Sequence, residues 1–315
     1  MLIARVRRTL VDRALIPARS RVLCACSGGP DSAALLFALV RLGPTLGFEV
    51  SAASVNHGLR PEAQRDVEIA ARQAAQLSVP FRALSVQVEP GASLQARARA
   101  ARYAALGRLA EELGASRIAV GHTRDDQAET VLARLLRGAG VRGLAAIEPA
   151  RADGVVRPLL DCERSEVHRL ARAEFSELAD DASNRDPRFE RVRIRAHVLP
   201  ALRAEDRALV RHLAELADEA RDVDRILELL AEALLAQAQL DTETLNISVL
   251  RPAAPLLRRA ALRRWLDPIS GGRLGRAELV QLDRTLRLGR GEVWISAAYA
   301  VRAEAPDRLR LCPRT

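Results

Sequence analysis

The stretch VLCACSGGPDSAALL, residues 22–36, is the one around which the chain is predicted to be organised. The apolar run Val22–Cys26 is too short for a helix and predicts a buried strand. Gly28 and Gly29 then predict a tight turn, because glycine lacks the side chain that restricts the backbone. From Ser32 onward the apolar residues predict a helix packed on a sheet. The stretch therefore predicts a strand, a glycine turn and a helix.

The turn has the composition of a phosphate-binding site. Backbone N–H groups beside the glycines, the hydroxyls of Ser27 and Ser32, and the positive end of the helix dipole can all point at an anion. Asp31 is an acid at the same place, which suggests a metal ion bridging it to that anion. The alternative is an ordinary turn with a capping Ser or Asp. A Walker-type loop is excluded, because the chain contains no lysine.

Composition limits the class of protein. The 315 residues predict two domains, and an apolar content of 49% is typical of a globular protein. The longest apolar run, residues 33–40, is too short to span a bilayer, so no membrane partner is expected. The four cysteines form no CxxC pair and lack metal-ligand spacing. We therefore expect a cytoplasmic protein without structural zinc.

The positive charge is concentrated at one end of the chain. Residues 251–315 contain 14 Arg and six Asp or Glu, and so carry eight of the nine net positive charges. Such a surplus suggests a polyanionic partner, and we favour nucleic acid. The alternative is a solvated surface produced by a coding bias toward arginine. That bias explains Arg in place of Lys, but not an excess over acid confined to one end.

Strands and helices alternate after the glycine turn. The predicted elements are strands at 48–55, 81–88 and 117–121, with helices at 61–77 and 93–113 between them. This order predicts an open parallel sheet with right-handed crossovers. Asn56 and His57 directly follow a strand, where ligands of such sheets bind. They either line a nucleotide site or cap the next helix.

A second polar cluster, GHTRDDQAET at residues 121–130, follows the strand at 117–121. On the helix predicted there, Asp126, Glu129 and Thr130 are three and four residues apart and share one face. That face points toward the carboxyl end of the strand, where the glycine turn also opens. The sequence therefore predicts that the two motifs converge on one nucleotide.

Acids are favoured in the first turn of any helix, so a single Asp there needs no functional explanation. That explanation does not cover His122, Asp126 and Glu129 together. Carboxylates that face a phosphate site need a metal ion or a cationic substrate between them. We expect a catalytic set of Asp31, His122, Asp126 and Glu129, with Asp31 and Asp126 as Mg²⁺ ligands. The sequence does not rank Asp125 against Asp126 as metal ligand.

Several motifs, in this order, resemble the tRNA(Ile)-lysidine synthases, which belong to the PP-loop ATP pyrophosphatases. They are SGGPDS (27–32), VNHGLR (55–60), GHTRDDQAET (121–130), LLRGAG (135–140), RPLL (157–160) and DASNRD (181–186). The resemblance covers about residues 20–200 and is only general from residue 201 on. Several specific motifs in one order make an accidental match improbable.

The resemblance implies an adenine-nucleotide-hydrolase-like α/β catalytic domain with an open parallel sheet over residues 1–200. Residues 201–315 are expected to form a smaller, mainly helical, Arg-rich tRNA-binding domain that ends in a β-hairpin, with strands at 292–300 and 307–311. The implied ATP-binding residues are Ser27, Gly28, Gly29, Pro30, Asp31, Ser32, Asn56, His57 and Arg137. The implied or expected contacts to lysine or tRNA are Asn184, Arg191, Arg193, Arg195, Arg258, Arg259, Arg263 and Arg264.

The reaction implied by the resemblance has two steps and uses ATP and Mg²⁺. ATP first adenylates the carbonyl oxygen at ring position two of the wobble cytidine in an isoleucine tRNA with a CAU anticodon, releasing pyrophosphate. The ε-amino group of free lysine then attacks that carbon and displaces AMP, giving lysidine. Asp126 and Glu129 would serve the metal and the lysine. No obligate protein partner is evident, and a homodimer stays open.

Two other functions stay open. A PP-loop tRNA thiolase would insert sulfur and would need cysteine pairs, which the sequence lacks. A non-catalytic RNA-binding protein with a vestigial nucleotide fold is opposed by the intact acidic set. Mass spectrometry of the modified tRNA separates the first alternative, and pyrophosphate release that depends on tRNA and lysine excludes the second.

Overall fold

The computed structural model describes residues 1–56, 58, 63–87, 91, 94–180, 186–272 and 274–313, the side chain of Gln95 excepted. The chain forms two compact units, residues 1–219 and 220–315. The assignment of catalysis to residues 1–200 and of tRNA binding to residues 201–315 stays a prediction. No helix in the described ranges combines the length and the apolar character needed to cross a membrane.

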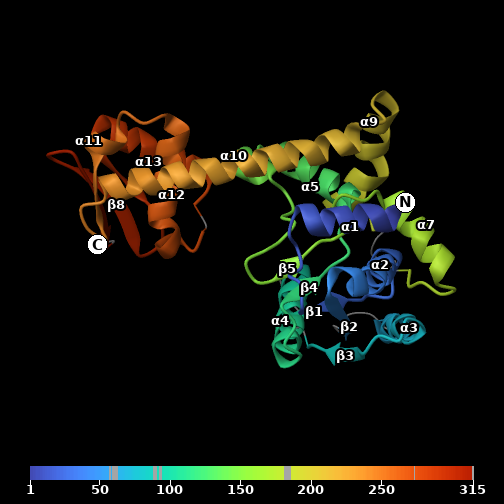
Figure 1. The fold of residues 1–315 in the computed structure, drawn as a ribbon. Coiled ribbons are helices and arrows are strands. Elements are labelled where there is room, and N and C mark those ends of the chain that lie inside the picture. The colour runs from blue at the N-terminus through green and yellow to red at the C-terminus, as the bar shows by residue number, and fades with distance from the viewer. Residues whose placement is uncertain are drawn as a thin grey trace. The chain divides into compact units, whose positions relative to one another are not determined.

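A five-stranded parallel sheet forms the centre of the first unit, which confirms the predicted fold class (Figure 1). The strands lie in the order β3-β2-β1-β4-β5. Their bounds are β1 Ser20–Ala25, β2 Phe48–Asn56, β3 Phe81–Ser85, β4 Arg117–Ala119 and β5 Val155–Val156. The chain order reverses between β1 and β4, and parallel sheets bind ligands at the carboxyl edge of such a switch point.

Helices cover both faces of the sheet. On one face pack α1 (Leu2–Asp12), α2 (Pro30–Leu46), α3 (Ala63–Gln76) and α7 (Arg164–Glu174). On the other face packs α4 (Leu94–Glu112). Right-handed crossovers produce this arrangement, because the chain runs outward from β1 to β3 and then returns to β4.

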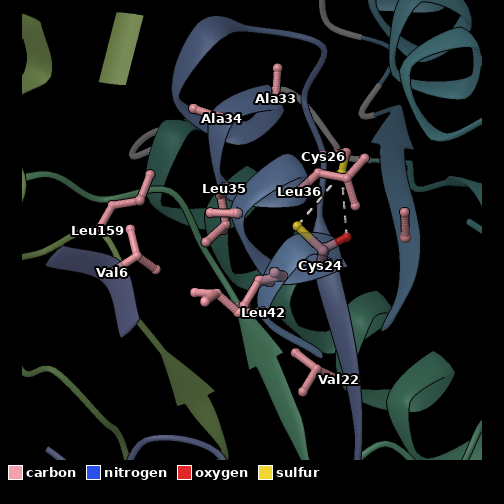
Figure 2. Packing of buried hydrophobic residues seen from close by; sticks show 14 of the residues in the cluster. Val6, Val22, Cys24, Cys26, Ala33, Ala34, Leu35, Leu36, Leu42 and Leu159 are labelled. Atoms are coloured by element: carbon pink, nitrogen blue, oxygen red, sulfur yellow. Dashed lines mark hydrogen bonds between the residues drawn. The ribbon is translucent and has the colours of Figure 1, made fainter. Parts of the chain in front are cut away.

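The strand before the glycine turn is buried among apolar side chains. Figure 2 shows Val22 and Cys24 of β1, and Cys26 just after this strand. They face Leu36 and Leu42 of α2. The two cysteines are free thiols with their sulfur atoms 3.7 Å apart. Their hydrogen bond and burial raise the pKa of the Cys24 thiol. Both residues therefore act as small apolar side chains, in agreement with the buried strand that the apolar run Val22–Cys26 predicts.

A second core of the first unit forms around α5 (Arg124–Leu136), which is followed by α6 (Val141–Leu144). Apolar residues of α5 pack against three elements that follow later in the chain. These are the π-helix η2 (Ile194–Val198), which directly follows α8 (Glu190–Arg193) in the sequence, α9 (Leu199–Glu205) and the start of α10 (Leu209–Ala238). The mainly helical stretch predicted from residue 201 is interrupted where the Asp206 carboxylate accepts the N–H of Ala208 at 2.8 Å. This packing holds α8 and η2 beside α5.

The second unit combines helices with a four-stranded antiparallel sheet in the order β6-β9-β8-β7. Besides residues 220–238 of α10, its helices are α11 Ile247–Leu250, α12 Pro255–Ser270 and α13 Arg276–Leu288. Its strands are β6 Thr244–Asn246, β7 Gly291–Trp294, β8 Tyr299–Glu304 and β9 Arg308–Pro313. Strands β8 and β9 form the predicted hairpin at the end of the chain.

The single strand predicted at 292–300 is wrong, because a turn divides it into β7 and β8. Ser296 makes this turn, since its hydroxyl oxygen accepts the N–H groups of Ala298 and Tyr299, each at 3.2 Å. The sheet of the second unit therefore contains four strands, where the sequence predicted two.

Candidate active site

The glycine turn is a hydrogen-bonded loop at the start of α2. The Ser32 hydroxyl accepts the N–H of Ser27 at 3.0 Å and donates to the carbonyl of Gly29 at 3.0 Å. The two serine hydroxyl oxygens lie 3.2 Å apart. Gly29 is the N-cap of α2, Pro30 stands in the first turn, and no described side chain caps the helix. The first N–H groups of α2 can therefore bind an anion.

Gly28 locks the loop against α3 and the segment after α7. Its φ is +77°, and a Cβ atom there would lie 2.7 Å from the carbonyl oxygen of Asp66. The Gly28 carbonyl accepts the side-chain N–H of Gln73 and the backbone N–H of Ala179, each at 2.9 Å. No residue with a side chain fits this position without displacing backbone.

The second motif meets the first at Gly121, two residues after the end of β4. A Cβ atom on Gly121 would lie 3.0 Å from the carbonyl carbon and oxygen of Asp31 and 3.2 Å from the nitrogen of Ser32. The absence of a side chain therefore lets the end of β4 pack against the loop. The two motifs lie at one edge of the sheet, as the sequence predicted.

Helix α7 also joins the two motifs. Its His168 Nε2 lies 3.1 Å from Asp31 Oδ1, while its Arg164 donates to Asp126 Oδ1 at 2.6 Å and to Glu129 Oε1 at 2.7 Å. Our sequence reasoning missed both residues. The signal that could have found them is their spacing of four residues, which places both on one face of a helix.

Asp126 and Glu129 are buried and lie one turn apart on α5. Besides Arg164, Arg191 donates to Glu129 Oε2 at 2.7 Å and to Asp126, and Arg195 donates to both oxygens of Glu129 at 2.7 and 3.0 Å. Burial alone would raise the pKa of both acids. Arg191 and Arg164 nevertheless hold the pKa of Asp126 well below its usual range, and Arg195 with Arg164 lowers that of Glu129. Both carboxylates are therefore ionised.

The carboxylate oxygens of Asp126, which was predicted to bind Mg²⁺, and of its neighbour Asp125 already have hydrogen-bond partners. Asp126 Oδ2 accepts the backbone N–H of Thr123 at 2.6 Å and its hydroxyl at 2.9 Å, so both Asp126 oxygens are occupied. Asp125 is bound by Arg203 at 2.6 Å and by the backbone N–H of Arg164 at 2.8 Å. Within the described ranges, no three His, Cys, Asp or Glu side chains cluster in a way that could hold a metal ion. Of Asp31, Asp125 and Asp126, Asp31 has the most exposed carboxylate. Mg²⁺ often takes one protein carboxylate plus substrate phosphates, so a magnesium site at Asp31 stays a prediction.

Comparison with known proteins identifies the family. Residues 3–202 match the family model described as PP-loop domain. A tRNA(Ile)-lysidine synthase of Symbiobacterium thermophilum is 40% identical over 325 residues, covering 96% of this chain and 67% of its own length. That of a Bradyrhizobium species is 39% identical over 319 residues, covering 92% and 88%. The chain belongs to the tRNA(Ile)-lysidine synthase family.

The glycine turn is thus the PP-loop of this family. Among solved structures, the chain is similar to a U34-tRNA thiolase from Methanococcus maripaludis with its [4Fe-4S] cluster. That likeness has a TM-score of 0.56 at 18% identity and covers 69% of this chain and 78% of the thiolase chain. It concerns the fold alone.

His122 stands beside the PP-loop, with its Nδ1 accepting the Arg157 Nε–H at 3.2 Å. Arginine has only donors, so Nδ1 is unprotonated and Nε2 carries the hydrogen. Burial lowers the pKa of His122 to about 3, and Arg157 and Arg191 add to this effect against the attraction of Asp126. The imidazole is therefore neutral near pH 7 and can act as a hydrogen-bond donor.

Two other residues predicted to bind ATP, Arg137 and Asn56, have protein partners in this structure. Arg137 is exposed at the far end of α5, about 20 Å along the helix axis from its start, and pairs with Glu190. Its expected contact with the nucleotide phosphates stays a prediction. Asn56 accepts the N–H of Gly58 at 2.8 Å, so its side chain closes the turn after β2. His57 lies outside the described residues.

The predicted lysine and tRNA contacts of the first unit divide into two groups. Arg191 and Arg195 join the acidic pair, whereas Arg193 donates to the carbonyls of Pro187 and Arg188, each at 2.9 Å. Arg193 is therefore not part of the acidic cluster. Asn184 lies outside the described residues.

In the second unit, the four predicted tRNA contacts differ in exposure. Arg258 is buried and donates to Asp283 Oδ1 at 2.6 Å, so it is a core residue rather than the surface contact we expected. Arg263 pairs with Glu228 and Arg264 with Glu232, while Arg259 is half-buried. A buried guanidinium needs such a partner, because desolvating a charge alone is costly.

Proposed function

We propose that this protein is a tRNA(Ile)-lysidine synthase. It joins lysine to carbon two of the wobble cytidine of the CAU-anticodon isoleucine tRNA, using ATP and releasing AMP and pyrophosphate. One observation carries the proposal: the PP-loop and the buried pair Asp126 and Glu129 converge through Gly121, Arg164 and His168. The identity of about 40% to proteins of that name supports the same activity.

The PP-loop suits the adenylation step. A carbonyl oxygen of a base is a poor leaving group, whereas AMP is a good one. The N–H groups at the start of α2 and the hydroxyls of Ser27 and Ser32 would stabilise the pyrophosphate as negative charge develops on it. Mg²⁺ held by Asp31 would supply further neutralisation of the phosphates. His168 would hold the Asp31 carboxylate in place.

The acidic pair suits the lysine step. Asp126 and Glu129 are ionised and have lowered pKa values, which makes them weak bases. They would therefore hold the lysine ammonium, and the proton that the amine loses before it attacks would pass to water rather than to these carboxylates. Three arginines already neutralise these two carboxylates, so an incoming ammonium has to replace a guanidinium. Arg191 and Arg195, once released, would be free to contact phosphates.

The remaining assignments are part of this proposal. We expect a cytoplasmic enzyme without an obligate protein partner. The tRNA contacts are expected from the arginines of both units, and binding should weaken steeply with salt.

Labelled lysine provides the test. We expect incubation with ATP and total tRNA to label one isoleucine tRNA, with AMP and pyrophosphate released in equal amounts. Asp31→Asn should abolish labelling and leave tRNA binding intact. It is a cleaner variant than Asp126→Asn, because Asp126 also caps α5 and pairs with buried arginines. A mass gain of sulfur instead of lysine, or ATP cleavage independent of tRNA, would refute the proposal.

A further inference from the structure

An arginine cluster surrounds Tyr103, a residue of α4. The guanidinium carbons of Arg99, Arg102 and Arg151 lie 5.0, 5.6 and 5.1 Å from the centre of its ring. Arg99 also donates to the Tyr103 hydroxyl at 3.4 Å. We call Arg99, Arg102, Tyr103, Arg151 and Arg157 the Tyr103 cluster.

The cluster has more positive charge than its carboxylates balance. Arg151 pairs with Asp153, and buried Arg157 donates to the backbone carbonyl of Glu148. Across the described ranges, neither Arg99 nor Arg102 lies within ion-pair distance of a carboxylate. Cation–π contacts contribute about 0.5–2 kcal/mol each, but they leave the charge in place.

The guanidinium groups of the cluster lie close enough together to repel one another. Burial lowers the pKa of Arg102, and the neighbouring charge of Arg99 lowers it further, against the attraction of Tyr103. Burial likewise lowers the pKa of Arg157, with Arg151 and Arg99 adding to the effect. A bound anion would relieve this repulsion.

The position of the cluster indicates which anion. Tyr103 packs in the core on the α4 face of the sheet, whereas α2, which starts at the PP-loop, covers the opposite face. The cluster reaches the active site through Arg157, which binds His122. The ATP phosphates already have the PP-loop, so the cluster is placed for a second polyanion that enters beside His122.

We propose that the Tyr103 cluster binds the phosphodiester groups of the tRNA next to the wobble nucleotide. This inference rests on the proposed function. Guanidinium groups bind phosphate through two parallel hydrogen bonds, and a stacked ring holds them flat and oriented for this contact. The cluster would fix the RNA strand while the base reaches the PP-loop.

The test compares Arg102→Gln with Arg108→Gln, an exposed arginine on the same helix without a described ion pair. We expect Arg102→Gln to weaken binding of an anticodon stem-loop RNA, measured without ATP, by about tenfold, and to reduce the salt slope by about one. ATP binding, measured without RNA, should stay unchanged. Arg108→Gln should change neither, and Arg102→Lys should restore part of the RNA affinity.

Each other outcome overturns the inference. Unchanged RNA affinity and salt slope would remove the cluster from the RNA path. Loss of ATP affinity instead would assign the cluster to the nucleotide phosphates. If Arg102→Gln fails to fold, exposed Arg99→Gln makes the same test. Lysidine formation by the unaltered protein is measured in parallel: its absence would refute the proposed function, whereas its presence with normal RNA binding in the variants would refute only this inference.

Discussion

Gly28 is the residue at which the PP-loop tolerates least change. A single added carbon would contact the Asp66 carbonyl oxygen at 2.7 Å, in a backbone conformation with φ of +77° that disfavours side chains. The N–H groups of the loop cannot keep their direction if the backbone moves there. The geometry of the phosphate site therefore depends on one missing side chain.

We expect Gly28→Ala to lower ATP affinity at least tenfold and the free energy of unfolding by about 1–3 kcal/mol. Equilibrium dialysis with ATP and urea unfolding measure the two effects. Gly107→Ala on α4 is the matched control, because nothing lies within 4 Å of the added carbon. It should keep ATP affinity and raise stability by up to about 1 kcal/mol. Equal ATP affinity in both variants would contradict the geometry described for the loop.

Three elements meet around the buried acids, and each contributes charge. Helix α5 supplies Asp126 and Glu129, α7 supplies Arg164, and the α8–η2 segment supplies Arg191 and Arg195. Removing one partner leaves another charge buried without full compensation. The α8–η2 segment should therefore depend on these pairs for its position.

Arg195→Gln tests this dependence. We expect it to lower the free energy of unfolding by about 1–3 kcal/mol, because Glu129 loses two of its hydrogen bonds. It should also lower the KM for lysine, because the ammonium then has one guanidinium fewer to replace. Hydrogen exchange in residues 190–198 should become faster. Arg193→Gln, two residues earlier, removes the same charge without touching Glu129 and should change neither quantity. Equal effects of the two variants would mean that net charge, not the pair, matters.

At the scale of the whole molecule, pairing with carboxylates does not change the charge surplus, but it leaves fewer unpaired arginines in the second unit than the sequence count suggests. In the second unit Arg258, Arg251 and Arg302 pair with Asp283, Asp307 and Glu292. Arg308 and Arg310 are exposed on β9, alternate with buried leucines, and have no hydrogen-bonded carboxylate among the described residues. These two arginines are therefore better placed than Arg258 to contact phosphates.

We expect the double variant Arg308→Gln, Arg310→Gln to weaken tRNA binding and reduce its salt slope by up to about two, since each lost phosphate contact removes about one from the slope. Arg263→Gln, whose side chain pairs with Glu228, should leave the slope unchanged. Filter binding at several salt concentrations measures both. A slope change only in the Arg263 variant would place the RNA on α12 instead.

The sequence by itself determined the features that depend on neighbours along the chain. The strand, glycine turn and helix at 22–36, the alternation of strands and helices, and the shared face of Asp126 and Glu129 follow from spacing within a few residues. The buried cysteines belong to the same group. The PP-loop family was accessible for the same reason, because its motifs are short and continuous.

Only the tertiary structure decided which charges meet. Arg164, Arg191 and Arg195 lie 35 to 66 residues from the Glu129 carboxylate they bind, and no local pattern pairs them. The same holds for the burial of Arg258 and for the pairing of Arg137 with Glu190. The physical reason is that the cost of burying a charge depends on which partner the fold brings within hydrogen-bond distance, and packing of remote elements sets that partner.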